Sequence, residues 1–100
     1  MAQVRQRQSR EDVSARADDY LAYLTREWEA LPALAAEWPG WQEEDRLDFC
    51  LEWPIREDRL AELTEWAEQG ALSPQQESRY RRLLALIATY RPLLEELLGG

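Results

Sequence analysis

The chain has 100 residues, 45% of them hydrophobic and 32% charged, and a formal net charge of -8. A chain of this length forms one domain with a modest core, and its share of hydrophobic residues argues against general disorder. Neither a signal peptide nor a membrane span is expected, because no apolar stretch follows the first ten residues and the longest purely apolar run covers only residues 83–88.

The first predicted helix begins near Ser9, which can act as its N-cap, with Glu11 and Asp12 placed favourably in the first turn. Residues 1–9 are then expected to form a flexible basic tail, and residues 10–98 a single helical domain. Apolar residues follow at alternating steps of four and three, which places them on one side of a helix. This stripe consists of Ala17, Leu21, Leu24, Trp28, Leu31, Ala35 and Trp38.

Two prolines, Pro32 and Pro39, interrupt and follow this stripe. Pro32 removes a backbone donor, so we expect a kink or break near Leu31, followed by a short helix over residues 32–38. Pro39 and Gly40 should end that short helix. A second Trp-Pro pair, Trp53-Pro54, predicts another helix boundary, with each tryptophan ring covering an end of the core.

Two helices are therefore predicted on either side of this boundary, over residues 42–53 and 54–69. The earlier one is apolar over about two-thirds of its girth, which favours a central position or a face shown to another chain. Its apolar residues are Leu47, Phe49, Cys50, Leu51 and Trp53. The later one should bury Ile55, Leu60, Leu63, Trp66 and Ala67, and end at Gly70 in the left-handed conformation, with Leu72 packing beyond it.

The last predicted helix has the clearest start. Ser73 is placed as N-cap, Pro74 at the first helical position and Gln76 at the position that completes a capping box. Pro92 should bend or break this helix near Arg91. Its stripe consists of Tyr80, Leu83, Ile87, Tyr90, Leu94 and Leu97.

Together these patterns predict an all-α fold. We expect a small helical bundle of three to four main helices with proline-induced breaks and an antiparallel helical hairpin in the C-terminal half. The first stripe is longer than a bundle of 100 residues easily covers, and the helix over residues 42–53 is apolar around most of its circumference. Both features predict a homodimer. A lone cysteine, Cys50, excludes a disulfide within the chain and makes the cytoplasm the simplest expectation for its location, while the exclusive use of arginine as basic residue is typical of a GC-rich bacterial genome.

Catalytic chemistry has few residues to use. The chain has no histidine, one cysteine and no glycine-rich phosphate loop, so we expect no enzyme activity and no cofactor or metal. Asp45 with Asp48, and Glu62 with Glu65, form two acidic pairs of i,i+3 spacing. This layout resembles the acidic motifs of the all-α nucleoside triphosphate pyrophosphohydrolases, and the resemblance implies two helices that present carboxylates to Mg²⁺.

The distribution of charge points instead to binding. Residues 11–70 are strongly acidic, which favours a basic protein partner over nucleic acid. An acidic stripe and three aromatic residues are the candidate contacts: Glu57, Asp58, Glu62, Glu65, Glu68, Trp41, Phe49 and Trp53. A small inhibitor or adaptor, similar to a bacterial antitoxin in size, acidity and helicity, is the leading hypothesis. The alternative is a nucleic-acid-linked regulator that uses Arg5, Arg7 and Arg10, or Arg79, Arg81 and Arg82.

Overall fold

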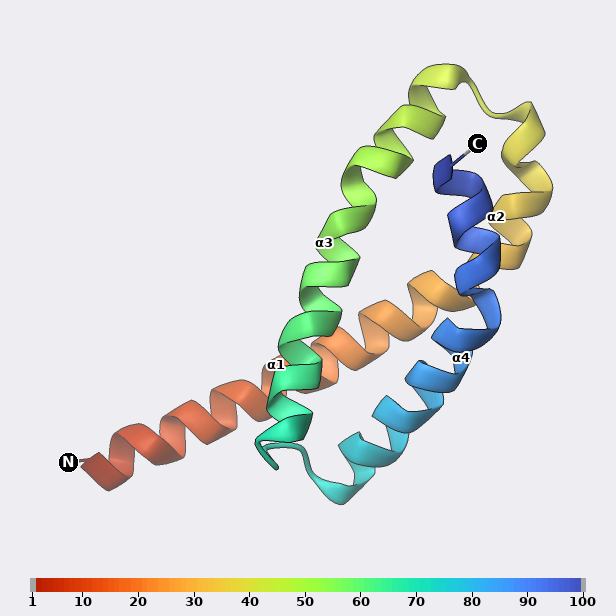
Figure 1. The fold of residues 1–100 in the computed structure, drawn as a ribbon. Coiled ribbons are helices and arrows are strands. Elements are labelled where there is room, and N and C mark those ends of the chain that lie inside the picture. The colour runs from red at the N-terminus through yellow and green to blue at the C-terminus, as the bar shows by residue number, and fades with distance from the viewer. Residues whose placement is uncertain (1, 100) are drawn as a thin grey trace.

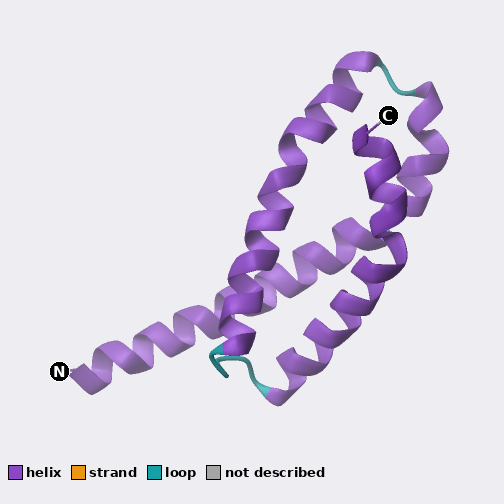
Figure 2. Ribbon diagram, viewed as in Figure 1, coloured by secondary structure: helices purple, strands orange, loops and turns teal. Residues whose placement is uncertain are grey.

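The fold of the computed structural model is a set of helices joined by short turns (Figures 1 and 2). The structure describes the backbone of residues 2–99 and the side chains of residues 12–99, and no strand occurs in that part of the chain. The helices are α1 (Ala2–Glu29), α2 (Leu31–Glu37), the 3-10 helix η1 (Trp38–Gly40), α3 (Glu43–Glu68) and α4 (Pro74–Gly99). The prediction of an all-α bundle is confirmed.

Helix α1 is longer than predicted, since its backbone begins at Ala2 rather than at Ser9. The side chains of Arg5, Arg7 and Arg10 lie outside the described residues, and the flexibility of residues 1–9 stays a prediction. The apolar stripe is confirmed, because Leu21, Leu24 and Trp28 are buried almost completely. Its alternating steps hold these side chains on one side of the helix, toward α3 and α4.

Proline acts differently at its several positions. At Pro32 the chain behaves as predicted: α1 ends at Glu29, Ala30 forms a turn, and α2 restarts with Pro32 in its first turn. Pro39 lies within η1, which ends the short helix, and Gln42 then occupies the N-cap position of α3. Proline at the start of a helix loses a donor that has no intrahelical partner anyway, so both positions are compatible with helix.

The boundary predicted at Trp53-Pro54 is wrong, because α3 runs through Pro54 without interruption. Pro54 cannot donate to the carbonyl one turn earlier, a loss that costs about 3 kcal/mol in a helix interior. A continuous α3 places Trp53 and Leu63 together in the core, and that burial outweighs the lost donor. The carbonyl that loses its donor at Pro54 is that of Cys50, four residues earlier.

Pro92 likewise lies inside α4 and does not break it. Helix α4 changes direction between its first half and its last turns in Figure 1, in agreement with the predicted bend. Two features of the sequence favour such a bend: the missing donor of Pro92 and the Thr89 hydroxyl, which donates to the Ala85 carbonyl at 2.9 Å.

The loop between α3 and α4 forms as the sequence predicts. Gly70 has a φ of +71°, and the amides of Gly70 and Ala71 donate to the carbonyls of Ala67 and Trp66 at 3.1 and 2.9 Å. This pair of hydrogen bonds is a Schellman motif, which favours glycine at the left-handed position. Leu72 then turns into the core, so the loop is fastened to the bundle.

The capping box at the start of α4 is also confirmed, and it does more than cap. The Gln76 amide donates to Ser73 Oγ at 3.1 Å, and the Ser73 amide donates to Gln76 Oε1 at 3.0 Å. Gln76 is buried, and its Nε2 donates across to α1, to the Ser14 carbonyl at 3.0 Å and to Asp18 Oδ1 at 2.9 Å. One side chain thus caps α4 and ties it to α1.

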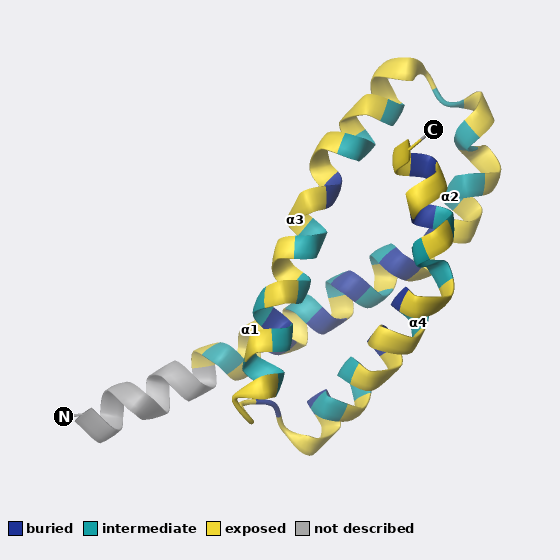
Figure 3. Ribbon diagram, viewed as in Figure 1, coloured by how far each residue is buried: buried dark blue, intermediate teal, exposed yellow. Residues whose placement is uncertain are grey.

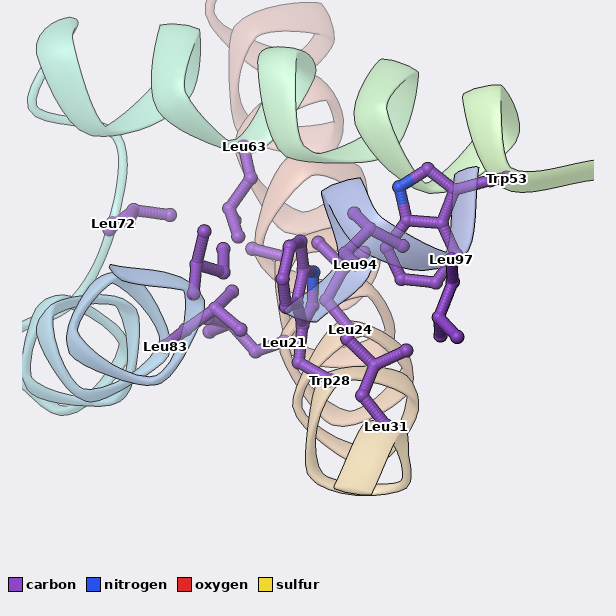
Figure 4. Packing of buried hydrophobic residues seen from close by; sticks show 12 residues of the cluster. Leu21, Leu24, Trp28, Leu31, Trp53, Leu63, Leu72, Leu83, Leu94 and Leu97 are labelled. Carbon is purple, nitrogen blue, oxygen red and sulfur yellow. The ribbon is translucent and has the colours of Figure 1, made fainter. Parts of the chain in front are cut away.

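The core lies between α1, α3 and α4. Figure 4 shows side chains from these helices pointing toward one another, with Leu31 of α2 and Leu72 of the loop closing its ends. Helix α4 packs most extensively against α1, and α3 and α4 run in opposite directions from their short loop, as the predicted hairpin requires (Figure 1). The half of α3 near this loop is held by stacking of Tyr20 on Trp66 and by a hydrogen bond between Thr64 and Tyr80.

The molecule is elongated, with principal extents of 55 × 24 × 17 Å and a radius of gyration of 16.2 Å. A globular domain of about 100 residues has a radius of gyration near 13 Å. Buried residues concentrate on α1 and α4, whereas much of α3 is exposed (Figure 3). None of the described helices combines the length and hydropathy needed to cross a membrane.

Candidate functional site

A row of aromatic rings links the surface of α3 to the core. Ring centroids lie 5.3 Å apart for Trp41 and Trp38, 5.4 Å for Trp38 and Phe49, 5.4 Å for Phe49 and Trp53, and 5.2 Å for Trp53 and Trp28. Trp28 and Trp53 are buried at the inner end. The outer three rings are half-buried, so aromatic surface stays accessible where η1 meets α3.

This accessible surface forms one wall of a hollow of about 430 Å³. The rings of Trp41 and Phe49 stand almost perpendicular to each other, with an interplanar angle of 88° and centroids 6.3 Å apart. Carboxylates line the hollow beside these rings. The complete lining is Gly40, Trp41, Gln42, Asp45, Asp48, Phe49 and Glu52, and we call it the Trp41 groove.

Local backbone geometry positions the groove. The Trp41 amide donates to the Trp38 carbonyl at 3.1 Å, and the chain then becomes extended before α3. Arg46 reaches back from α3, donating from Nε to the Trp38 carbonyl at 3.1 Å and from Nη2 to the Pro39 carbonyl at 2.9 Å. Its guanidinium carbon also lies 5.8 Å from the centre of the Trp38 ring. Arg46 thus fastens η1 to α3 and fixes one side of the groove.

Beside the groove, α3 carries an apolar stripe that nothing in the described structure covers. Leu47, Leu51 and Ile55 are 57%, 68% and 51% exposed. Their spacing of four residues places them on one side of the helix. Ile55 was predicted to be buried, and that prediction is wrong, because the continuous α3 turns this position away from α1. We call these residues the apolar stripe of α3.

The predicted acidic stripe is divided by the fold. Asp58, Glu65 and Glu68 are exposed, and the last two border a shallow hollow floored by Leu60, Ala61 and Thr64. Their side chains form no ion pair within residues 12–99.

Glu57 and Glu62, also part of the predicted acidic stripe, are instead half-buried and hydrogen-bonded to neighbouring helices. Glu57 accepts hydrogen bonds from Arg91 Nη1 and Nη2, at 3.1 and 3.4 Å, and from Trp53 Nε1 at 3.1 Å. Glu62 accepts one from the Tyr20 hydroxyl at 2.8 Å. Helices α1 and α4 flank α3, so acids at the edges of its buried side meet partners from both.

The aromatic candidates also separate. Trp41 and Phe49 line the groove, whereas Trp53 is only 3% exposed and belongs to the core. The sequence did not indicate Asp45, Asp48 and Glu52 as parts of a groove, nor Ile55 as an exposed residue in line with Leu47 and Leu51.

The arrangement implied by the resemblance to pyrophosphohydrolases is absent. Asp48 and Glu62 lie on one continuous helix, and at roughly 1.5 Å per residue α3 rises about 21 Å between them. The two acidic pairs therefore cannot share a Mg²⁺ ion from facing helices. Within residues 12–99, no cluster of three or more acidic or cysteine side chains has the geometry to hold a metal ion.

Of the three α4 arginines in the alternative nucleic-acid hypothesis, one is paired with an acidic side chain. Arg79 donates from Nη1 to Asp18 at 3.1 Å, while Arg81 and Arg82 are exposed on α4. The hypothesis stays a prediction, since its other half rests on Arg5, Arg7 and Arg10, whose side chains are not described.

Comparisons with protein-family models, with curated proteins and with solved structures gave no match to this chain. Its function has to be inferred from its own side chains.

Proposed function

We propose that this chain is a small interaction module whose α3 binds a basic protein partner. The observation that supports this most is the concentration on α3 of carboxylates without an ion-pair partner in residues 12–99, next to accessible aromatic and apolar side chains. The carboxylates beside these side chains include Asp45, Asp48, Glu52, Asp58, Glu65 and Glu68. Charge and apolar surface on one helix give a partner both attraction and something to bury.

The biological class that fits is an inhibitor or adaptor of the antitoxin type, acting in the cytoplasm of a bacterium on a basic enzyme. Like charges at helical spacing destabilise an isolated helix by about 0.2–0.5 kcal/mol per pair, so α3 carries a repulsion that a basic partner would relieve. Complementary charge raises the association rate and the specificity more than the affinity, which suits an inhibitor that must find its target quickly.

The first test is charge reversal in the half of this surface that lies toward the end of α3. Asp58→Arg with Glu65→Arg should leave the fold intact, because both side chains are exposed and neither forms a hydrogen bond or ion pair within the described residues. Affinity capture from the native host, followed by identification and titration of the retained proteins, should show that the wild type holds a basic protein that the double variant loses. Retention should fall between roughly 0.05 and 0.5 M salt as screening strengthens.

Glu95→Arg with Glu96→Arg is the matched control, since both residues are exposed on α4 and the change in charge is identical. Equal loss by both double variants would mean that only net charge matters. Retention by all three proteins alike would contradict docking through Asp58 and Glu65.

A second copy of the chain is the partner that the apolar stripe favours. Leu47, Leu51 and Ile55 are already partly buried, so covering their remaining exposed surface would stabilise a dimer by roughly 1–2 kcal/mol per side chain. A twofold interface contains the stripe of both copies, so six such side chains would contribute. A stable interface buries about 1,200 Å² or more in total, so two α3 helices would have to pair along much of their length.

Leu51→Glu tests this dimer. At micromolar concentration the wild type should sediment as a dimer of the 11.8 kDa chain, and the variant as a monomer with unchanged helicity, because a glutamate would face its twin across the interface. Leu84→Glu, an equal change at an exposed leucine of α4, should leave the dimer intact. A wild type that sediments only as a monomer would contradict the proposal.

A further inference from the structure

Arginine, an aromatic ring and a carboxylate recur as a unit in this fold. The guanidinium of Arg91 lies 5.1 Å from the centre of the Trp28 ring and bonds Glu57, and that of Arg56 lies 5.0 Å from the Trp53 ring and bonds Glu27 at 2.8 Å. Each ring thus has a cation on its face, and each cation has a carboxylate beside it.

A third unit has the same parts in another order. Arg59 lies 5.1 Å from the centre of the Tyr20 ring and donates to the Tyr20 hydroxyl at 3.0 Å, and that hydroxyl donates to Glu62. Cation–π attraction contributes about 0.5–1 kcal/mol at exposed sites and more where water is excluded, so these units add to the stability of the helix contacts.

The Trp41 groove has two of the three components. Trp41 and Phe49 supply perpendicular ring faces, and the carboxylates are those of Asp45, Asp48 and Glu52. Neither ring has a guanidinium over its face, and none of these carboxylates forms an ion pair, within the described side chains of residues 12–99. The nearest arginine along the chain, Arg46, is bound to the Trp38 and Pro39 carbonyls.

Helix stability accounts for only part of this negative charge. Glu43, Glu44 and Asp45 lie in the first turn of α3, where acids interact favourably with the helix dipole. Asp48 and Glu52 lie further along, where that effect has fallen off. Asp48 lies three residues from Asp45 and four from Glu52, spacings at which like charges on a helix repel, and none of the three forms an ion pair within residues 12–99. A cation in the groove would reverse that repulsion.

We propose that the Trp41 groove binds an arginine side chain of the basic partner. The guanidinium would stack on the Trp41 ring and donate to the carboxylates of Asp45 and Asp48, which completes the unit already formed at Trp28 and Trp53. Arginine fits better than lysine, because its planar group stacks on rings and its fork of donors matches carboxylates. The inference rests on the proposed function and names the residue type that α3 recognises.

The test uses a short Gly-Ser peptide with one central arginine, and the same peptide with lysine or with citrulline, the neutral isostere. Binding is followed by NMR at the indole Nε1–H signals, with Trp41→Phe identifying the Trp41 signal. The arginine peptide should shift the Trp41 signal and bind about tenfold more tightly than the citrulline peptide, with lysine in between. The Trp53 signal should stay in place, since that indole is bound to Glu57.

Asp45→Asn with Asp48→Asn keeps the shape of the groove and should remove the preference for arginine, whereas Glu95→Gln with Glu96→Gln on α4 should not. Equal binding of the arginine and citrulline peptides, or shifts that spare Trp41, would overturn the inference. The proposed function would survive that result if the basic partner is still captured through Asp58 and Glu65. Conversely, the proposed function would fail and the arginine site would stand if the arginine peptide binds in the groove but no captured partner is lost when α3 is altered.

Discussion

Trp28→Ala should lower the free energy of unfolding by about 3–5 kcal/mol, the usual cost of deleting a buried tryptophan. Trp28 is 1% exposed, meets the Trp53 ring at an interplanar angle of 82°, and carries the Arg91 guanidinium on its face. The substitution removes all of these contacts and leaves a cavity where α1, α3 and α4 meet. Since the free energy of unfolding of small domains is only about 5–15 kcal/mol, the variant should retain little of its stability.

Urea denaturation followed by circular dichroism measures this loss. Trp41→Ala is the matched control, because it deletes the same side chain where it is half-buried at the groove, and it should cost far less. Trp28→Phe should recover part of the stability by refilling the cavity. Equal losses for Trp28→Ala and Trp41→Ala would contradict the position of the core described here.

Gln76→Glu should also destabilise the fold, by about 2 kcal/mol or more, although glutamate is a favoured residue at this position of a capping box. A glutamate can still accept the Ser73 amide. It cannot donate to the Ser14 carbonyl or to Asp18, so a buried carboxylate would face two acceptors. The capping box thus needs an acceptor at residue 76, whereas the contact with α1 needs a donor, and of the two residues only glutamine supplies both.

Thermal or urea denaturation of Gln76→Glu beside Ser73→Ala separates these roles. Ser73→Ala removes only the cap and should cost about 1 kcal/mol. A Gln76→Glu variant as stable as the wild type would show that the capping box matters and the link from α4 to α1 does not.

Local patterns were sufficient for much of the fold. The stripe through Leu21, Leu24 and Trp28, the left-handed Gly70 and the Ser73 cap depend on neighbours within one or two turns, so the sequence predicts them correctly. Pro54 could not be predicted in this way. Its local effect is to stop a helix, and only the shared burial of Trp53 and Leu63 explains why α3 continues.

The candidate site was predicted less well, for the same reason. Trp41 and Phe49 were found from composition and position, but the division of the acidic stripe depends on Tyr20 and Arg91, which come from distant parts of the chain. The sequence allows Leu47 and Leu51 to form a face shown to another chain, but the predicted boundary separates Ile55 from them. The spacing of four from Leu47 through Leu51 to Ile55 crosses Pro54, so the three residues share one side only on a continuous helix.

The contact between α1 and α4 also sets the order of events during synthesis. Ser14 and Gln76 are 62 residues apart. Because ribosomes add roughly 5–20 residues per second, Gln76 is synthesised about 3–12 seconds after Ser14. During that interval Leu21, Leu24 and Trp28 have no surface of α4 to pack on. Nascent α1 is therefore a stretch that chaperones can bind, and the core closes only after α4 has left the ribosome.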